Sequence, residues 1–214
     1  GTGILQAAQV TAVSNTGKGL SVNASSTISN LKVAADTELN VAAGETLSGA
    51  VEVAEDKTLT LSGTGTLGSA LKLEGTLEAG ASLKVTGLIS VADNATVSIP
   101  AASTTLTYSG GDINVGAHTM AIGGAGTFSN SSGSPLVLDL PDSILDLTGS
   151  GTISGSVKLE GGTLKSSGSP TISGTLTQYD NATIEVASGQ TLTYSGTSLN
   201  LGANELTLSG GGTF

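Results

Sequence analysis

Apolar residues alternate with polar ones in short bursts along the whole chain. Leu20 and Val22 are separated by one polar residue, as are Leu31 and Val33, and the same spacing returns up to the C-terminus. Alternation with a period of two residues is typical of a β-strand with one buried face, whereas an amphipathic helix repeats every three to four residues. The pattern predicts an all-β chain of many short strands.

The clearest succession of expected strands lies between residues 43 and 128. The expected strands are Val51–Val53, Leu59–Leu61, Leu71–Leu73, Leu83–Val85, Ile89–Val91, Val97–Ile99, Leu106–Tyr108, Ile113–Val115 and Met120–Ile122. The segments between them are rich in Gly, Asn, Asp and Ser, which accept the backbone conformations of tight turns. We expect a change of chain direction at each of these segments.

Two long stretches repeat at an offset of 86 residues. Thr105–Phe128 and Thr191–Phe214 align without a gap, and Leu61–Gly75 matches Leu147–Gly161 at the same offset. The chain therefore divides into a partial unit (1–42), a first unit (43–128) and a second unit (129–214). Thr127 and Phe128 hold the place of Thr213 and Phe214, and no capping segment follows. We expect one continuous solenoid that is a segment of a longer repetitive protein, or that stacks on another chain.

A finer repeat is marked by pairs of Thr with an apolar residue: Thr46-Leu47, Thr66-Leu67, Thr127-Phe128, Thr152-Ile153 and Thr171-Ile172. Their spacing indicates about four coils of roughly 21 residues in each unit, in the range of β-helix repeats. The predicted fold is a single-stranded parallel β-helix (a β-solenoid) of roughly ten coils. With about 4.8 Å between strand layers, the rod would be about 48 Å long.

Composition agrees with a thin interior. Aromatic residues make up 2% of the 214 residues, and Gly contributes 32. A thick globular core would normally carry more large aromatic side chains. Mean hydropathy is +0.23 and charged residues make up only 11%, which disfavours disorder, since disordered chains are polar and highly charged.

Charge and missing residue types exclude several classes of function. The net charge is −10, and all seven basic residues are Lys. A negative field without Arg disfavours nucleic-acid binding. The absence of Cys excludes disulfides and thiolate chemistry. No run of about 18 apolar residues is present, so we expect no membrane insertion.

The Gly-Thr-Leu steps carry a family resemblance. Leu59–Gly80 (LTLSGTGTLGSALKLEGTLEAG) and Leu192–Phe214 (LTYSGTSLNLGANELTLSGGGTF) resemble repeats of autotransporter passenger domains and of filamentous-haemagglutinin-like adhesins. The resemblance covers most of residues 43–214 and implies a parallel β-helix on a bacterial surface. No active-site motif of these families is present, so the resemblance assigns no functional residue.

Clustered carboxylates are the candidate metal ligands. Asp139, Asp142 and Asp146 lie close together in the sequence, and Glu55-Asp56 falls at the equivalent bend of the first unit. Calcium binds six to eight hard oxygen ligands, so these residues are weak calcium candidates. The calcium-binding nonapeptide repeat is absent, and solvated charges at turns are the simpler interpretation. We assign no other metal or cofactor.

Catalytic residues are not indicated. The only histidine, His118, is replaced by Asn204 in the second unit, and no triad or zinc site can be assembled around it. Paired acids would suit a polysaccharide-cleaving β-helix, but the chain lacks Arg, Trp and a long loop to build the cleft. We therefore expect no enzyme activity.

Two other patterns bear on the surface of the rod. Tyr108 and Tyr194 are equivalent, as are Phe128 and Phe214, but they would lie roughly 19 Å apart, so we interpret them as core or corner residues. Thr-x-Thr elements beginning at Thr58, Thr105, Thr175 and Thr191 are typical of ice-binding solenoids. Their unequal spacing does not indicate one position per coil.

The preferred interpretation is a structural repeat segment of a secreted or cell-surface bacterial fibre or adhesin, acting as a rigid spacer or matrix element. Its partners would be neighbouring repeats of the same polypeptide or like chains. The first alternative is an adhesin module that binds a glycan or protein receptor, with calcium as a candidate ligand. A polysaccharide-active β-helix enzyme is the third.

Overall fold

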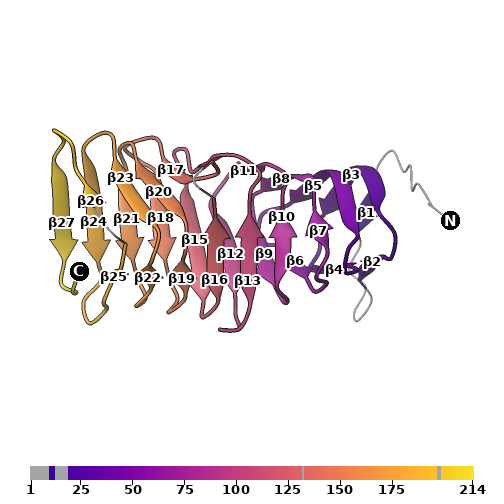
Figure 1. Ribbon diagram of the computed structural model, residues 1–214. Helices are drawn as coiled ribbons and strands as arrows, with labels where there is room; N and C mark the ends of the chain where they lie inside the picture. The colour runs from indigo at the N-terminus through magenta and orange to yellow at the C-terminus, as the bar shows by residue number, and fades with distance from the viewer. Residues whose placement is uncertain (1–9, 13–18, 132, 197–198) are drawn as a thin grey trace.

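The protein is a straight rod of stacked β-strands, with residues 10–12 near one end and the C-terminus at the other (Figure 1). The structure, a computed structural model, describes residues 10–12, 19–131, 133–196 and 199–214. Within these ranges every strand pairing is parallel and no helix occurs. The all-β parallel solenoid predicted from the alternating pattern is confirmed. Most coils contribute three strands, and in two coils near the N-terminal end one long strand bends across two faces, so the wall of the rod has three faces throughout.

The first face is formed by the strands that open each coil. Two long strands, β3 (Ser26–Val33) and β5 (Thr46–Val53), supply it with their N-terminal halves and then bend into the second face. The remaining strands of the first face, in order along the rod, are β7 (Thr66–Leu67), β10 (Leu83–Val85), β13 (Thr105–Tyr108), β16 (Thr127–Asn130), β19 (Thr152–Ile153), β22 (Thr171–Ile172) and β25 (Thr193–Tyr194).

The second face continues from the C-terminal halves of β3 and β5. Its other strands are β1 (Val10–Ala12), β8 (Ala70–Leu73), β11 (Ile89–Val91), β14 (Ile113–Asn114), β17 (Leu136–Leu138), β20 (Ser156–Leu159), β23 (Thr175–Gln178) and β26 (Leu199–Asn200). Strand β11 pairs with β8 and is followed along the axis by β14, so the face runs on into the next sheet.

The third face is one unbroken 10-stranded sheet. Its strands are β2 (Leu20–Val22), β4 (Thr37–Val41), β6 (Thr58–Leu61), β9 (Thr76–Ala79), β12 (Ala95–Ile99), β15 (Thr119–Gly124), β18 (Ile144–Leu147), β21 (Thr163–Ser166), β24 (Ala182–Val186) and β27 (Leu206–Gly210). Ten layers are joined by nine full turns in this part of the chain, close to the expected number of coils.

The core is a set of aliphatic ladders that run along the axis. Leu59, Leu77 and Val97 are stacked in register in the third face, and each has a fully buried side chain. Because every second residue of a strand points inward, each layer places its apolar residues on those of the next layer. Burial of one such side chain contributes about 1.5–3 kcal/mol. A single coil could bury none of them alone.

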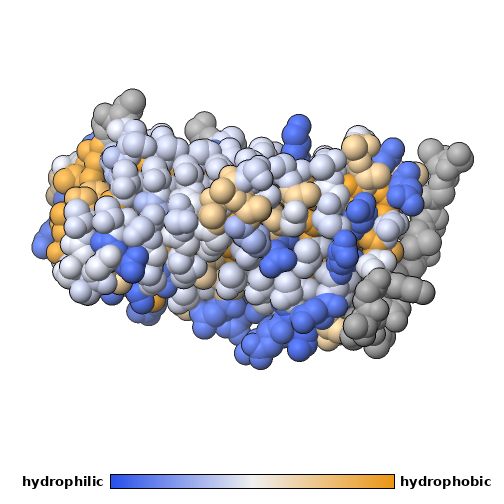
Figure 2. Space-filling view, turned by 90° about the horizontal axis from the view of Figure 1, so that it is seen from below, coloured by the Kyte–Doolittle hydropathy of each residue, from blue (hydrophilic) through white to orange (hydrophobic). Residues whose placement is uncertain are grey.

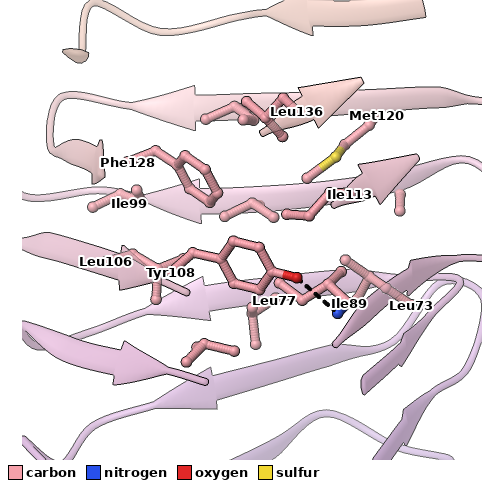
Figure 3. Packing of buried hydrophobic residues seen from close by; sticks show 14 of the residues in the cluster. Leu73, Leu77, Ile89, Ile99, Leu106, Tyr108, Ile113, Met120, Phe128 and Leu136 are labelled. Carbon is pink, nitrogen blue, oxygen red and sulfur yellow. Dashed lines mark hydrogen bonds between the residues drawn. The ribbon is translucent and has the colours of Figure 1, made fainter. Parts of the chain in front are cut away.

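Two aromatic residues lie side by side in this interior. Tyr108 and Phe128 are 1% and 0% exposed, and their ring centroids lie 6.4 Å apart on adjacent coils. The Tyr108 hydroxyl accepts a hydrogen bond of 3.3 Å from the backbone N–H of Ile89 (Figure 3). The interpretation of this pair as core residues is confirmed.

Coil length varies while the strand register is kept. The chain covers a shorter stretch between the paired residues Thr66 and Lys84 than between the paired residues Phe128 and Ile153. The extra residues lie in the corners. Where the corner is tightest, a glycine is needed: Gly49, at the bend of β5, has a φ of 111°, and a Cβ atom there would lie 1.7 Å from the carbonyl oxygen of Ile28.

Side-chain oxygens hold the corners of successive coils together. The backbone N–H of Thr119 donates to Asn94 Oδ1 at 2.8 Å, and that of Glu205 donates to Asn181 Oδ1 at 2.8 Å. The bonds from Thr105 to Ser82 Oγ and from Thr191 to Ser169 Oγ form a second such pair. The same corner bonds therefore recur, within one position, at the offset found in the sequence.

Candidate functional site

A ladder of hydroxyl groups covers the first face over five consecutive coils. Two parallel columns form it, and we call them together the hydroxyl face. The first column is Thr105, Thr127, Thr152, Thr171 and Thr193, and the second is Thr107, Ser129, Ser154, Ser173 and Ser195. Strand pairing places each threonine of the first column directly beside the next.

The alternation of the strands turns these side chains outward. Between the two columns lie Leu106, Phe128, Ile153 and Ile172, all of which point into the core and are at most 3% exposed. Neighbours on either side of a buried strand residue point to the opposite side of the sheet. The second column stays in step because the backbone N–H groups of Ser154, Ser173 and Ser195 bond to carbonyls of the preceding coil.

The hydroxyl face carries no charge. None of residues 103–109, 125–131, 150–155, 168–174 or 190–196 is Asp, Glu, Lys or Arg. Elsewhere on the first face, Lys84 in β10 is outward-facing and charged. The surface over these five coils therefore consists of hydroxyls, methyl groups and backbone, repeated in two directions.

Sequence reasoning missed this ladder because the steps between its members are unequal. The chain takes a longer path from Thr127 to Thr152 than from Thr152 to Thr171, although both steps advance the ladder by one coil. The Thr-apolar pairs marked these three positions as successive coils, whereas the pairing of strands adds Thr105 and Thr193 and shows that all five share one outward-facing column. A detectable signal does exist, since each coil carries Thr, a large apolar residue, and Ser or Thr in succession.

Most carboxylates gather at a different place, the corner between the second and third faces. We call this the acidic corner. It holds ten of the 17 acidic residues of the chain: Asp36, Glu55, Asp56, Glu74, Asp93, Asp139, Asp142, Glu160, Asp180 and Glu205. Near the C-terminal end, a groove of about 570 Å³ is lined by four of them (Asp139, Glu160, Asp180 and Glu205) and by Thr163, Thr183 and Thr207.

The calcium candidates are not brought together into one site. Asp139 Oδ1 accepts a 2.8 Å hydrogen bond from the backbone N–H of Gly116, and Asp142 is exposed at the turn beyond it. Asp146 lies on the third face, where Lys165 Nζ is 4.0 Å away and Ser167 Oγ donates to it at 3.0 Å.

Glu55 and Asp56 occupy the acidic corner four layers from Asp139. Asp56 has a φ of 57°, and it is the one residue other than glycine with a positive φ in the described ranges. Across those ranges, no group of three or more His, Cys, Asp or Glu side chains could hold a metal ion. Glu55, Asp56, Asp139 and Asp142 are charges of the acidic corner, and Asp146 is a charge of the third face.

The remaining candidates have structural surroundings. His118 lies at the acidic corner beside Gly116, and its backbone carbonyl accepts a hydrogen bond from Ile144. Tyr194 packs against the core, whereas Phe214 is 44% exposed at the C-terminal end. There, hydrophobic side chains colour the end of the rod orange in the space-filling view, while much of the side wall is pale (Figure 2).

Comparison of the chain with protein-family models, with curated proteins and with solved structures found no match. Within the part of the chain that the structure describes, no helix is long and apolar enough to cross a bilayer.

Proposed function

We propose that the protein is a rigid structural spacer, a repeat segment of a secreted or cell-surface bacterial fibre or adhesin. The single observation that carries this proposal is the unbroken register of the third face from β2 to β27. A rod whose layers are all joined by parallel backbone hydrogen bonds has no hinge at which to bend. Such a rod can hold a neighbouring segment at a fixed distance.

Surface charge supports the same role. The acidic corner runs along the rod from Asp36 to Glu205, and the net charge is −10. Like charges distributed along parallel rods oppose their nonspecific association. Among the described residues, most ion pairs, such as Lys32 with Glu52 at 3.3 Å, use lysines of the partly exposed second face, and one joins Lys165 to Asp146 on the third face. Each such surface pair contributes little to stability.

The experiment compares the chain with a variant in which residues 129–214 are duplicated after Phe214. Four added layers should lengthen the rod by about 19 Å at constant cross-section. Small-angle X-ray scattering measures both quantities. An increase in cross-section, or a maximum dimension that does not grow, would show that added units do not extend a rigid rod and would overturn the proposal.

A further inference from the structure

We propose that the hydroxyl face binds the surface of ice. The observation behind this proposal is a grid with two regular repeats on one uncharged surface, five threonines deep along the axis and two hydroxyl residues wide along the strands. A ligand for such a grid should itself be uncharged and periodic in two directions, because an isolated small molecule would use only one or two of its positions.

The dimensions of the grid fit crystalline water. Parallel strands lie about 4.8 Å apart, and residues i and i+2 of one strand lie about 6.6 Å apart. In a tetrahedral network with O–H···O distances of about 2.75 Å, second-neighbour oxygens lie about 4.5 Å apart and stacked layers repeat about every 7.3 Å. The strand spacing therefore matches the second-neighbour distance, and the spacing of residues i and i+2 matches the layer repeat, each within about a tenth. Over the four steps from Thr105 to Thr193 the axial mismatch sums to roughly 1 Å, a small part of one repeat.

The chemistry of the side chains also fits this ligand. Each threonine presents a hydroxyl, which donates and accepts hydrogen bonds as a water molecule does. Its methyl group lies beside the hydroxyl and restricts the orientation of neighbouring water. Charged groups bind water strongly in their own geometry, and the grid itself includes none; a charged residue, Lys84, pairs with Thr107 at the N-terminal edge of the second column.

A second copy of the chain fits the face less well. The grid measures roughly 19 Å by 7 Å. A dimer formed through it would bury far less than the roughly 800 Å² per partner of a standard protein interface. A crystal face is not limited in this way, because it extends the same lattice beyond the edges of the grid.

The third face provides a matched control. Thr58, Thr76 and Thr96 are also stacked in register on adjacent coils, and Thr76 is partly exposed, as is Thr152. However, Glu78 lies two residues after Thr76 on the same side of β9, so this column stands beside a carboxylate. Replacing one threonine on each face by tyrosine adds the same bulk at comparable strand positions, and tyrosine is well tolerated in strands.

The test is partition of the purified chain into slowly growing ice, compared with Thr152→Tyr and Thr76→Tyr. We expect the parent chain to be enriched in ice, Thr152→Tyr to lose this enrichment, and Thr76→Tyr to retain it. Thermal melts of all three chains establish that each is folded. If Thr152→Tyr is unfolded at the temperature of the experiment, Thr152→Val, which keeps the shape and loses the hydroxyl, replaces it.

Three outcomes would overturn the proposal. The first is exclusion of the parent chain from ice. The second is equal partition of the two tyrosine variants. The third is a dimer, seen by sedimentation, that Thr152→Tyr abolishes, because a second copy of the chain would then cover the face. A chain that is excluded from ice can still be a rigid rod, so this proposal and the spacer function fail independently.

Discussion

At the scale of single residues, Tyr108 combines two constraints. Its ring lies within the core against Phe128, and its hydroxyl accepts a hydrogen bond from the backbone N–H of Ile89. Burial raises the pKa of the Tyr108 phenol, and the hydrogen bond from Ile89 opposes this only partly. The folded chain therefore holds this side chain in its neutral form.

Alkaline pH should destabilise the protein through Tyr108. In the unfolded chain a tyrosine loses its proton near pH 10. Because the folded pKa is raised, the contribution to stability is complete below about pH 10 and is lost as pH rises through the folded pKa. Urea unfolding at a series of pH values from about 8 to 12 measures this loss.

The variant Tyr108→Phe is the control for this effect. It should lower the free energy of unfolding at neutral pH by about 1 kcal/mol, since a buried N–H loses its partner, but its stability should fall less steeply above pH 10. Tyr179 and Tyr194 remain in both chains. Parallel pH curves for the two chains would contradict the assignment to Tyr108.

At the scale of strands, the contribution of an apolar residue to stability depends on whether another coil packs over it. Ile122 in β15 and Leu208 in β27 hold the same place in the two units. Ile122 is 6% exposed, because β18 covers it, whereas Leu208 is 58% exposed. The two strand sequences are similar, so the difference in exposure comes from the next layer, which covers β15 and does not cover β27.

This difference predicts unequal effects of truncation. Ile122→Ala should lower the free energy of unfolding by about 2–5 kcal/mol through lost burial and a residual cavity. Leu208→Ala should change it by about 0.5 kcal/mol. Equilibrium urea titrations of the two variants test this, and equal losses would show that burial by the next layer is not the cause.

Strands were predictable from the sequence, but their register was not. Leu59, Leu61, Leu71 and Leu73 all lie in strands as expected, because a period of two survives in even the shortest segments. The Thr-apolar pairs marked the step from Thr152 to Thr171 as one coil, and this is confirmed, but the register of the other strands could not be derived, because corners of variable length carry no register information. The acidic corner was seen in part, through Glu55 and Asp139, but its continuity along the rod required the order of the coils.

At the scale of the whole molecule, the C-terminal layer of the described rod leaves large hydrophobic side chains exposed. Leu201, Leu208 and Phe214 are between 37% and 58% exposed. Their equivalents in the first unit, Val115, Ile122 and Phe128, are buried by residues 136–153, where Leu147 pairs with Ile122 and Ile153 pairs with Phe128. The same segment should therefore fit the C-terminal layer as well.

Adding a copy of residues 129–155 after Phe214 should raise the melting temperature. The added strands can pair with β26 and β27, and the copy of Thr152–Ile153 can pair with Thr213–Phe214, so that the three exposed side chains become buried. For a domain of this size, each kcal/mol gained raises the melting temperature by about 2–4 °C. A Gly-Ser tail of equal length is the control for mere extension. A melting temperature no higher than that of this control would contradict the expected stacking.

The positions of the acidic corner and the hydroxyl face give the rod a distinct front and back. In a three-faced cross-section, the corner between the second and third faces lies opposite the first face. Negative charge is thus concentrated on one flank and missing from the other over the five C-terminal coils, which amounts to a transverse electric dipole. Near a charged wall the molecule would adopt a preferred roll angle about its long axis, turning its acidic flank away from an anionic surface.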